Sequence, residues 1–291
     1  MTRALVLSGG GPLAVAWEVG LLWGLAQAGL DLSDADYILG TSAGAIVGAH
    51  LAFGRSPEAL VRGFLADAEQ PQGADWAQAF PIPAVARLPA LFAQAHEGIG
   101  DEGRAAVGAY ARQAATPPAQ VHRERMVEAL AEAEWSDKAL GCCVVDAESG
   151  AVRVLERDCG APLVDAVAAS TGLPGLTPPV AVDGRLYLDG GLRSSANADL
   201  ATGHERVLVV SFQQPGPAGP RIAARLAEQV SRLEAGGAKV WVIACDAAVQ
   251  AAIGDSTWDL RRRPAVVQAG IVQGLAAAAA AAQEVWEPPG A

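Results

Sequence analysis

Short apolar runs alternate along the chain with longer segments whose apolar residues recur at helical spacing. Residues 4–7 form the first apolar run, and residues 12–28 predict a helix that opens on a proline and ends before Gly29. A second run, at residues 37–39, precedes a predicted helix over residues 42–53. Strands that alternate with helices in this way are typical of a parallel sheet covered by helices.

The pattern changes between about residues 66 and 135. Three prolines interrupt an apolar segment there, and Thr116-Pro117-Pro118 opens a segment rich in Glu and Arg, which predicts a helical insertion. After it the alternation resumes, and Glu148-Ser149-Gly150 supplies the turn of a predicted hairpin. We therefore expect a single α/β domain over residues 1–291, with a cap or lid insertion at about 66–135. The later predicted strands are 140–145, 151–155, 185–188, 207–212 and 239–244.

Composition narrows the classes of partner. The 291 residues carry a formal net charge of −11, which argues against a nucleic-acid partner and against electrostatic capture by an anionic membrane. No signal peptide or membrane span is evident, because the apolar run at 275–282 is short. Of the four cysteines, Cys142 and Cys143 are neighbours in a predicted strand and point to opposite faces, so a disulfide between them is not expected. The cysteine spacing also indicates no metal site, and a reduced, cytoplasmic protein is the expectation.

The strongest candidate for chemistry is the run Gly40-Thr41-Ser42-Ala43-Gly44, between a predicted strand and a predicted helix. In that context G-x-S-x-G predicts a nucleophile elbow, in which a strained turn projects the serine hydroxyl from the carboxyl edge of the sheet. The residues around the serine must be small because strand and helix pass close by, and Gly40 and Gly44 meet that need. The dipole of the following helix favours negative charge near Ser42. A simple turn of small residues is the alternative.

A second glycine cluster, Gly9-Gly10-Gly11, follows the first predicted strand. Successive glycine amides can point at a developing oxyanion, which acyl transfer requires, so these three glycines are the candidate oxyanion hole. The alternative is a dinucleotide loop, since Gly9-x-Gly11-x-x-Ala14 fits G-x-G-x-x-G/A. That alternative needs an acidic residue at the end of the second strand, where this chain has the serine run instead, and so a nucleotide-binding oxidoreductase is the weaker hypothesis.

A serine nucleophile needs a base. Asp189 ends a predicted strand and runs into Gly190-Gly191, and an aspartate in an apolar cleft has a pKa high enough for a direct Ser–Asp dyad. A hairpin turn, as expected for Asp183-Gly184 just upstream, is the competing interpretation of Asp189. A triad of Ser42, Asp189 and His204 is formally possible, although a lone histidine before a strand is more often a surface residue.

The glycine loop, the serine run and the Asp189 turn together resemble the three signature blocks of the patatin-like phospholipases, in order, over residues 4–200. The segment 169–174 resembles that family's A-S-x-x-x-P block, and Asn197 falls where an asparagine is common. The resemblance implies a three-layer α/β/α fold with a mostly parallel central sheet and a lipid acyl hydrolase. It implies Ser42 as nucleophile, Asp189 as base and the amides of Gly9 to Gly11, Gly10 and Gly11 above all, as the oxyanion hole. It implies no metal and no nucleotide cofactor.

The glycine loop departs from the family at one point. The family usually continues G-x-[RK]-G, whereas this chain reads Gly11-Pro12-Leu13-Ala14, so a cation is missing beside the expected oxyanion site. A catalytically weak, lipid-binding or regulatory protein is therefore the main alternative to an acyl hydrolase. The expected partner is an acyl lipid or phospholipid, with transient contact with lipid surfaces. Residues expected to line an acyl channel, or else to pack the cap on the core, are Trp76, Phe80, Ile82, Leu88, Leu91 and Phe92.

Overall fold

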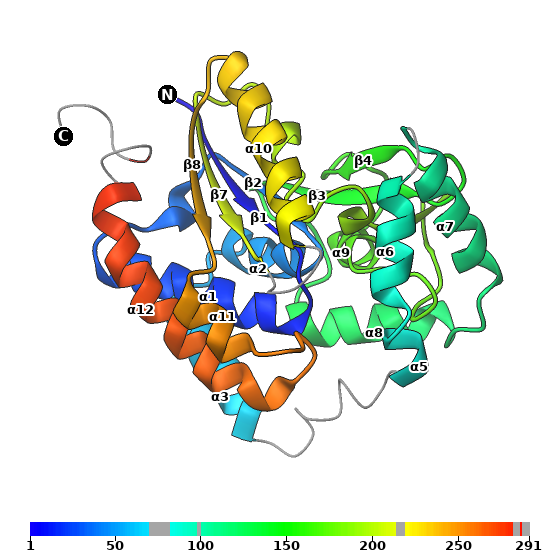
Figure 1. Cartoon of the computed structure of the whole chain (residues 1–291), viewed down its shortest axis with the longest axis horizontal. Helices are drawn as coiled ribbons and strands as arrows, with labels where there is room; N and C mark the ends of the chain where they lie inside the picture. The colour runs from blue at the N-terminus through cyan, green and yellow to red at the C-terminus, as the bar shows by residue number, and fades with distance from the viewer. Residues whose placement is uncertain (70–81, 98–99, 214–218, 282–285, 287–291) are drawn as a thin grey trace.

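A computed structural model describes residues 1–69, 82–97, 100–213, 219–281 and 286 of the chain (Figure 1). Its centre is one sheet of eight strands. Seven of them follow the order β5-β6-β3-β2-β1-β7-β8, and the eighth, β4, pairs with β3 outside that order. Strands β3, β2, β1, β7 and β8 run parallel, while β4, β5 and β6 form antiparallel pairs. The bounds are β1 Arg3–Leu7, β2 Tyr37–Thr41, β3 Ala139–Asp146, β4 Val152–Leu155, β5 Val180–Val182, β6 Arg185–Asp189, β7 Arg206–Ser211 and β8 Lys239–Ala244.

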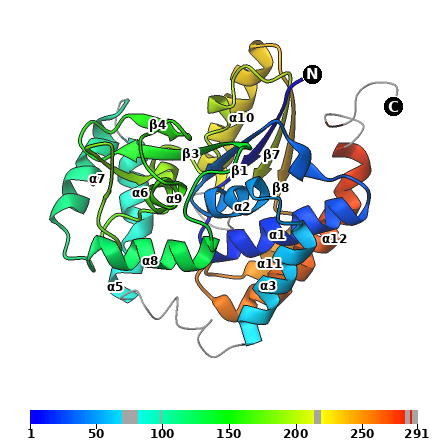
Figure 2. The ribbon, with the colours of Figure 1, turned by 180° about the vertical axis from the view of Figure 1, so that it is seen from behind.

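Both faces of this sheet are buried, which explains why its strands are apolar without a polar side. Leu5 and Leu7 of β1 belong to the core on one face, whereas Ala4 and Val6 belong to the core on the other. Helices α1 (Pro12–Gln27), α2 (Ala43–Ala52), α9 (Leu163–Ser170) and α12 (Arg263–Ala281) cover the first face, as Figure 2 shows from behind. Helix α10 (Gly219–Ala235) covers the second face (Figure 1). The predicted three-layer α/β/α fold is confirmed.

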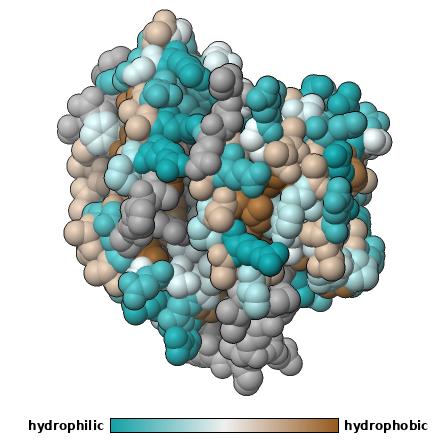
Figure 3. All heavy atoms as spheres, turned by 45° about the vertical axis from the view of Figure 1, so that its right-hand side comes forward, coloured by the Kyte–Doolittle hydropathy of each residue, from teal (hydrophilic) through white to brown (hydrophobic). Residues whose placement is uncertain are grey.

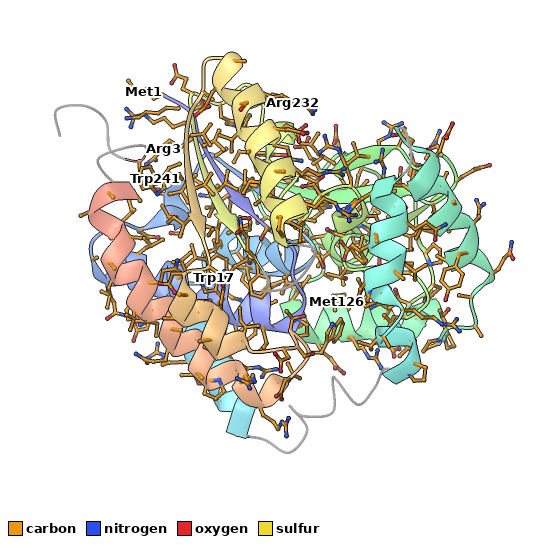
Figure 4. All side chains as sticks on the ribbon, in the orientation of Figure 1. Met1, Arg3, Trp17, Met126, Arg232 and Trp241 are labelled. Atoms are coloured by element: carbon orange, nitrogen blue, oxygen red, sulfur yellow. The ribbon has the colours of Figure 1, made fainter. Side chains whose placement is uncertain are left out.

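Helices α1 and α12 cross at unusually short distance because glycines line both. A Cβ atom on Gly20 would lie 2.3 Å from the Val267 carbonyl oxygen, and one on Gly274 would lie 2.3 Å from that of Leu21. At the same crossing Trp17, labelled in Figure 4, donates a hydrogen bond of 2.8 Å to the side chain of Gln273. By length and composition alone the segment Leu260–Ala281 could cross a membrane, whereas the apolar run at residues 275–282 had appeared too short to do so. That evidence is weak, because a core helix packed like α12 passes the same test.

The described part of the expected insertion is helical. It contains α3 (Pro57–Glu69) at its start, then α5 (Ile82–Val85), α6 (Leu88–Glu97), α7 (Glu102–Gln113) and α8 (Ala119–Leu130). Buried residues of α6 and α7 pack against Val145 of β3 and Leu188 of β6, so these helices lie beside the antiparallel end of the sheet. The prediction that this insertion acts as a lid stays a prediction. Two of its expected channel residues, Trp76 and Phe80, lie outside the described residues, as does the side chain of Ile82.

Candidate active site

Ser42 occupies a sharp turn between β2 and α2. Its backbone has φ 52° and ψ −114°, a region that costs an L-residue about 1–3 kcal/mol and is found where the surrounding structure imposes it. The Ser42 amide donates a 3.0 Å hydrogen bond to the hydroxyl of Ser170, which in turn donates to the Cys143 carbonyl at 2.7 Å. Ser170 is fully buried, and through these two hydrogen bonds its hydroxyl links the Ser42 turn to β3. The Ser42 side chain is left half-buried at the first turn of α2.

The glycines on either side of Ser42 are required by space. A Cβ atom on Gly40 would lie 2.5 Å from the Cα of Ala45, and one on Gly44 would lie 2.1 Å from the carbonyl oxygen of Leu7. Both clashes are with backbone, which cannot move aside without separating β2, α2 and β1. The small residues at these two positions therefore let strand and helix approach closely enough to form the turn.

Asp189 ends β6 and lies next to Ser42, although 147 positions separate them in the sequence. Its side chain is buried, with 1% of the residue exposed, and accepts a 2.7 Å hydrogen bond from the Gly191 amide. Burial raises the pKa of Asp189 to about 6, while hydrogen bonds from the Ser42 side chain and the Gly191 amide oppose that rise. The chain after Asp189 enters a short 3-10 turn, η3 (Gly190–Leu192), and not a hairpin.

The glycine loop lies against the same turn. A Cβ atom on Gly9 would be 3.0 Å from the Cβ of Ser42, so a larger residue would press on the serine. The amide of Gly9 donates a 2.8 Å hydrogen bond to the Ser195 carbonyl, however, and so already has a partner. Gly10 and Gly11 are therefore the better candidates, and an oxyanion role for the Gly9 amide stays a prediction. Within the described ranges the amides of Gly10 and Gly11 donate to no protein group, and Gly11 has φ 79° at the start of α1.

Asn197 joins the elbow to the aspartate turn. Its side-chain amide donates to the Thr41 hydroxyl at 3.2 Å, to the Gly190 carbonyl at 3.1 Å and to the Ser194 carbonyl at 2.7 Å. Asn197 itself has φ 49°, the left-handed conformation that asparagine tolerates better than most residues. These three hydrogen bonds fix the end of β2 relative to the end of β6, and hence Ser42 relative to Asp189.

The histidines do not support a triad. His204 stacks on the ring of Tyr37, with the ring centroids 5.1 Å apart, and Tyr37 begins β2 at the edge opposite Ser42. His50 and His122 are buried in helices α2 and α8, and burial lowers the pKa of each. His96 of α6 lies near the backbone of Gly191, which the sequence did not indicate, and burial lowers its pKa to about 4.

An apolar cluster borders the site. It consists of buried Leu88 and Leu176 with partly buried Phe92, Leu173 and Trp258 among its neighbours. A Cβ atom on Gly11 would lie 3.9 Å from the ring of Trp258, and one on Gly191 would lie 3.1 Å from the ring of Phe92. The cluster therefore reaches both the glycine loop and the aspartate turn. Of the residues expected to line an acyl channel, Leu88 and Phe92 are in this cluster, and Leu91 packs deeper, towards β3.

Among the described residues, no group of three or more His, Cys, Asp or Glu could hold a metal ion. All four cysteines are free thiols. The polar groups at the site are one hydroxyl, one buried carboxyl and backbone amides, which suffice chemically for covalent acyl transfer.

Comparison with known proteins places this geometry in a family. None of the curated proteins compared matches the chain. Two solved structures to which the chain is similar are VipD from Legionella pneumophila (13% identity, TM-score 0.48) and the type III effector protein ExoU (16% identity, TM-score 0.37). The matches cover 96% and 94% of this chain but only 67% and 53% of those proteins. At such TM-scores neither neighbour supports an argument about activity.

The family comparison is more specific. The model for patatin-like phospholipases matches residues 5–202, a range that includes the glycine loop, the serine turn, Asp189 and Asn197. It leaves the alternative of a nucleotide-binding oxidoreductase without support. Because the match extends over more than half of the 291 residues, the chain belongs to the patatin-like phospholipase family.

Proposed function

We propose that this protein is a serine carboxylic-ester hydrolase that acts on acyl lipids through a dyad of Ser42 and Asp189. The observation that carries the proposal is that Ser42, held at φ 52° on the elbow, lies close enough to the buried carboxyl of Asp189 to influence its pKa. Family membership supports hydrolysis of a lipid substrate in general. The dyad and the carboxylic-ester bond are the finer parts of the proposal.

The first half of the reaction forms an acyl-enzyme. Asp189, as the carboxylate, takes the proton of Ser42 while Oγ attacks the carbonyl carbon of the ester. The oxyanion that forms accepts hydrogen bonds from the amides of Gly10 and Gly11, and the α2 dipole adds to its stabilisation. Collapse of the intermediate breaks the ester C–O bond, and the proton on Asp189 goes to the leaving alkoxide. The acyl group stays on Ser42.

The second half returns the enzyme to its starting state. A water molecule gives a proton to Asp189 as its oxygen attacks the acyl carbon. The second tetrahedral intermediate uses the same glycine amides, and its collapse restores the Ser42 hydroxyl with the proton from Asp189. The products are a free carboxylic acid and the alcohol, and the apolar cluster around Leu88 and Trp258 supplies a surface for the acyl chain.

A lipid-binding protein with little activity is the second candidate. The observation that favours it is Leu13, which is fully buried where the family usually carries a cation. A cation at that position of this fold would be desolvated, so the hydrophobic residue suits the core at the expense of charge near the oxyanion site. This candidate predicts a fatty acid that co-purifies with the protein, without turnover of esters.

A panel of esters tests the proposal. Purified protein is assayed on p-nitrophenyl esters of increasing chain length and on a lysophospholipid, beside Ser42→Ala and a control, Ser231→Ala, at an exposed position of α10. We expect turnover by the wild type and by the control, and a loss of at least about a thousandfold in Ser42→Ala. Equal turnover by Ser42→Ala would refute the proposal, and bound fatty acid without turnover would favour the second candidate.

A further inference from the structure

Arginines gather beside the aspartate turn in a chain whose net charge is −11. Arg104 of α7, Arg193 after η3, and Arg221 and Arg225 of α10 lie close enough for their charges to interact with one another or with His96. We call these four residues the arginine cluster. They come from three separate parts of the sequence: α7, the segment after η3, and α10.

Two members of the arginine cluster are neutralised by carboxylates. Arg193 forms a bidentate pair with Asp199, at 2.8 and 2.6 Å, and both groups are largely buried. Arg104 hydrogen-bonds Asp101 and donates to the Gly150 carbonyl at 2.7 Å. These two arginines therefore serve the structure of the turn and of α7.

The other two are less closely matched, since Glu228 of α10 lies near enough to act on the charge of Arg225 but forms no ion pair with it within the described ranges. In the part of the chain that the structure describes, neither Arg221 nor Arg225 forms an ion pair. Arg225 is half-buried, and its Nη1 donates a hydrogen bond to the Arg193 carbonyl. Its pKa is lowered by burial first and then by the neighbouring Arg104 and Arg193. Placing a cation here is unfavourable unless an anion joins it.

These arginines lie near the segment that follows Asp189, the proposed base. The Arg193 carbonyl that binds Arg225 is four residues beyond Asp189. His96 lies near the backbone of Gly191, whose amide donates to Asp189. The Nε2 atom of His96 is buried with no hydrogen-bond partner within the described ranges. The arginines thus flank the aspartate turn, while Phe92 and the rest of the apolar cluster also contact that turn. In Figure 3 hydrophobic atoms are visible in a recess between hydrophilic side chains on this side of the molecule.

We propose that Arg221 and Arg225, with His96 beside them, form a phosphate subsite that binds the headgroup phosphodiester of a glycerophospholipid substrate. The inference rests on the proposed function, because it places this anion next to the ester that Ser42 attacks. Guanidinium groups bind phosphate oxygens through charge-assisted hydrogen bonds, and an apolar surface close by suits an acyl chain. The cation that the family carries in its glycine loop is replaced here by buried Leu13, and the arginines supply positive charge from α10.

A selectivity ratio tests the subsite. For each variant we measure kcat/KM on a lysophospholipid and on a monoacylglycerol with the same acyl chain, and we take the quotient. Arg225→Gln and Arg221→Gln are each expected to lower this ratio about tenfold, mainly through KM on the phospholipid. Arg225→Lys is expected to recover part of the loss. Arg62→Gln, which removes an exposed arginine of α3, is the control and leaves both rates and the ratio unchanged.

The outcomes that overturn the subsite are distinct. An unchanged ratio in both glutamine variants would overturn it, and so would an equal change in Arg62→Gln. Arg221 is exposed and forms no hydrogen bond or ion pair with another described residue, so Arg221→Gln separates an effect of charge from an effect on folding. Thermal melting of each variant identifies any protein that fails to fold.

A binding experiment keeps the inference independent of turnover. If wild-type protein hydrolyses neither substrate, the proposed function fails, but the subsite is still tested by calorimetry on the Ser42→Ala protein. We expect saturable binding of sn-glycerol 3-phosphate that weakens about tenfold when Arg225→Gln is added. Absence of binding would refute the subsite. Binding of inorganic phosphate with no effect of Arg225→Gln on selectivity would indicate a site for free phosphate and overturn the headgroup assignment.

Discussion

Replacing Asp189 with asparagine is expected to abolish activity and yet to stabilise the fold at alkaline pH. The carboxyl is buried and has a pKa of about 6 in the folded protein, against an ordinary value of 3.8. An asparagine of the same shape keeps an acceptor oxygen for the Gly191 amide, which now hydrogen-bonds the carboxyl at 2.7 Å. It can carry no negative charge and take no proton from Ser42.

The size of the effect follows from the difference between the two pKa values. That difference, about two units, corresponds to about 3 kcal/mol of destabilisation once Asp189 is ionised. Because the pKa is raised by folding, the wild type is free of this penalty below pH 3.8 and bears it fully above about pH 6. We therefore expect Asp189→Asn to be more stable than wild type by up to about 3 kcal/mol at pH 8, and to lose that advantage at pH 4.

Activity should depend on the same ionisation. Wild-type kcat/KM on a p-nitrophenyl ester is expected to be flat above about pH 7 and to fall about tenfold per pH unit below pH 6, because only the carboxylate accepts the serine proton. Asp189→Asn should have a kcat/KM about 10²–10⁴ below that of wild type above pH 7, and this difference should shrink as the pH falls below 6, where the wild type is itself protonated. Urea unfolding at pH 4 and pH 8 gives the stabilities, and Asp137→Asn, at a surface position, serves as control. Retained turnover, or a variant less stable than wild type at pH 8, would refute the reasoning.

Two further substitutions, one of them with a matched control, test the packing that supports the site. Gly44→Ala should destabilise the fold by about 2–4 kcal/mol in the same urea titration, since its methyl group would lie 2.1 Å from the Leu7 carbonyl oxygen. The control is Gly63→Ala in helix α3, where a methyl group would meet no atom within 4 Å, and it should be neutral or slightly stabilising. Glu18→Gln should raise the free energy of unfolding at neutral pH, because burial raises the pKa of this fully enclosed carboxyl. The variant should also lose less stability than wild type as the pH rises above the ordinary glutamate range. A steeper loss of stability in the variant would contradict this.

Local sequence signals were sufficient for the first half of the sheet. The runs at residues 4–7 and 37–39 are apolar and each ends in glycines or a serine turn, so strand, turn and helix were all apparent. The hairpin at residues 140–155 and the turn at Asp183-Gly184 were also predicted, and both are present. The three-residue strand β5 was missed, because so short a segment shows no alternation of its own.

Helix α12 was missed for a different reason. Its apolar and small residues are spread around the helix, and its buried face is defined by glycines that contact α1 far away in the sequence. A helix without a polar face shows no helical periodicity of apolar and polar residues in its sequence. An alanine-rich segment could also equally well be exposed. Only the tertiary contact with α1 identifies which side is buried.

The site was predicted as a set of residue types but not as a set of contacts. Ser42 and Asp189 could be named from glycine turns, although nothing local shows that they meet. The Gly9 amide hydrogen-bonds the Ser195 carbonyl, 186 positions away, so no local signal showed that this amide already has a partner. For the same reason the sequence did not indicate that His96 and Arg225 lie near the segment that follows Asp189.

Covalent labelling of the nucleophile tests the central claim most directly. Protein is treated with a fluorophosphonate probe, its intact mass is measured, and the modified peptide is sequenced, with Ser42→Ala in parallel. The Ser–Asp dyad predicts one adduct per chain, located on Ser42, and none on Ser42→Ala. An adduct on another residue, or labelling of Ser42→Ala to the same extent as wild type, would contradict it.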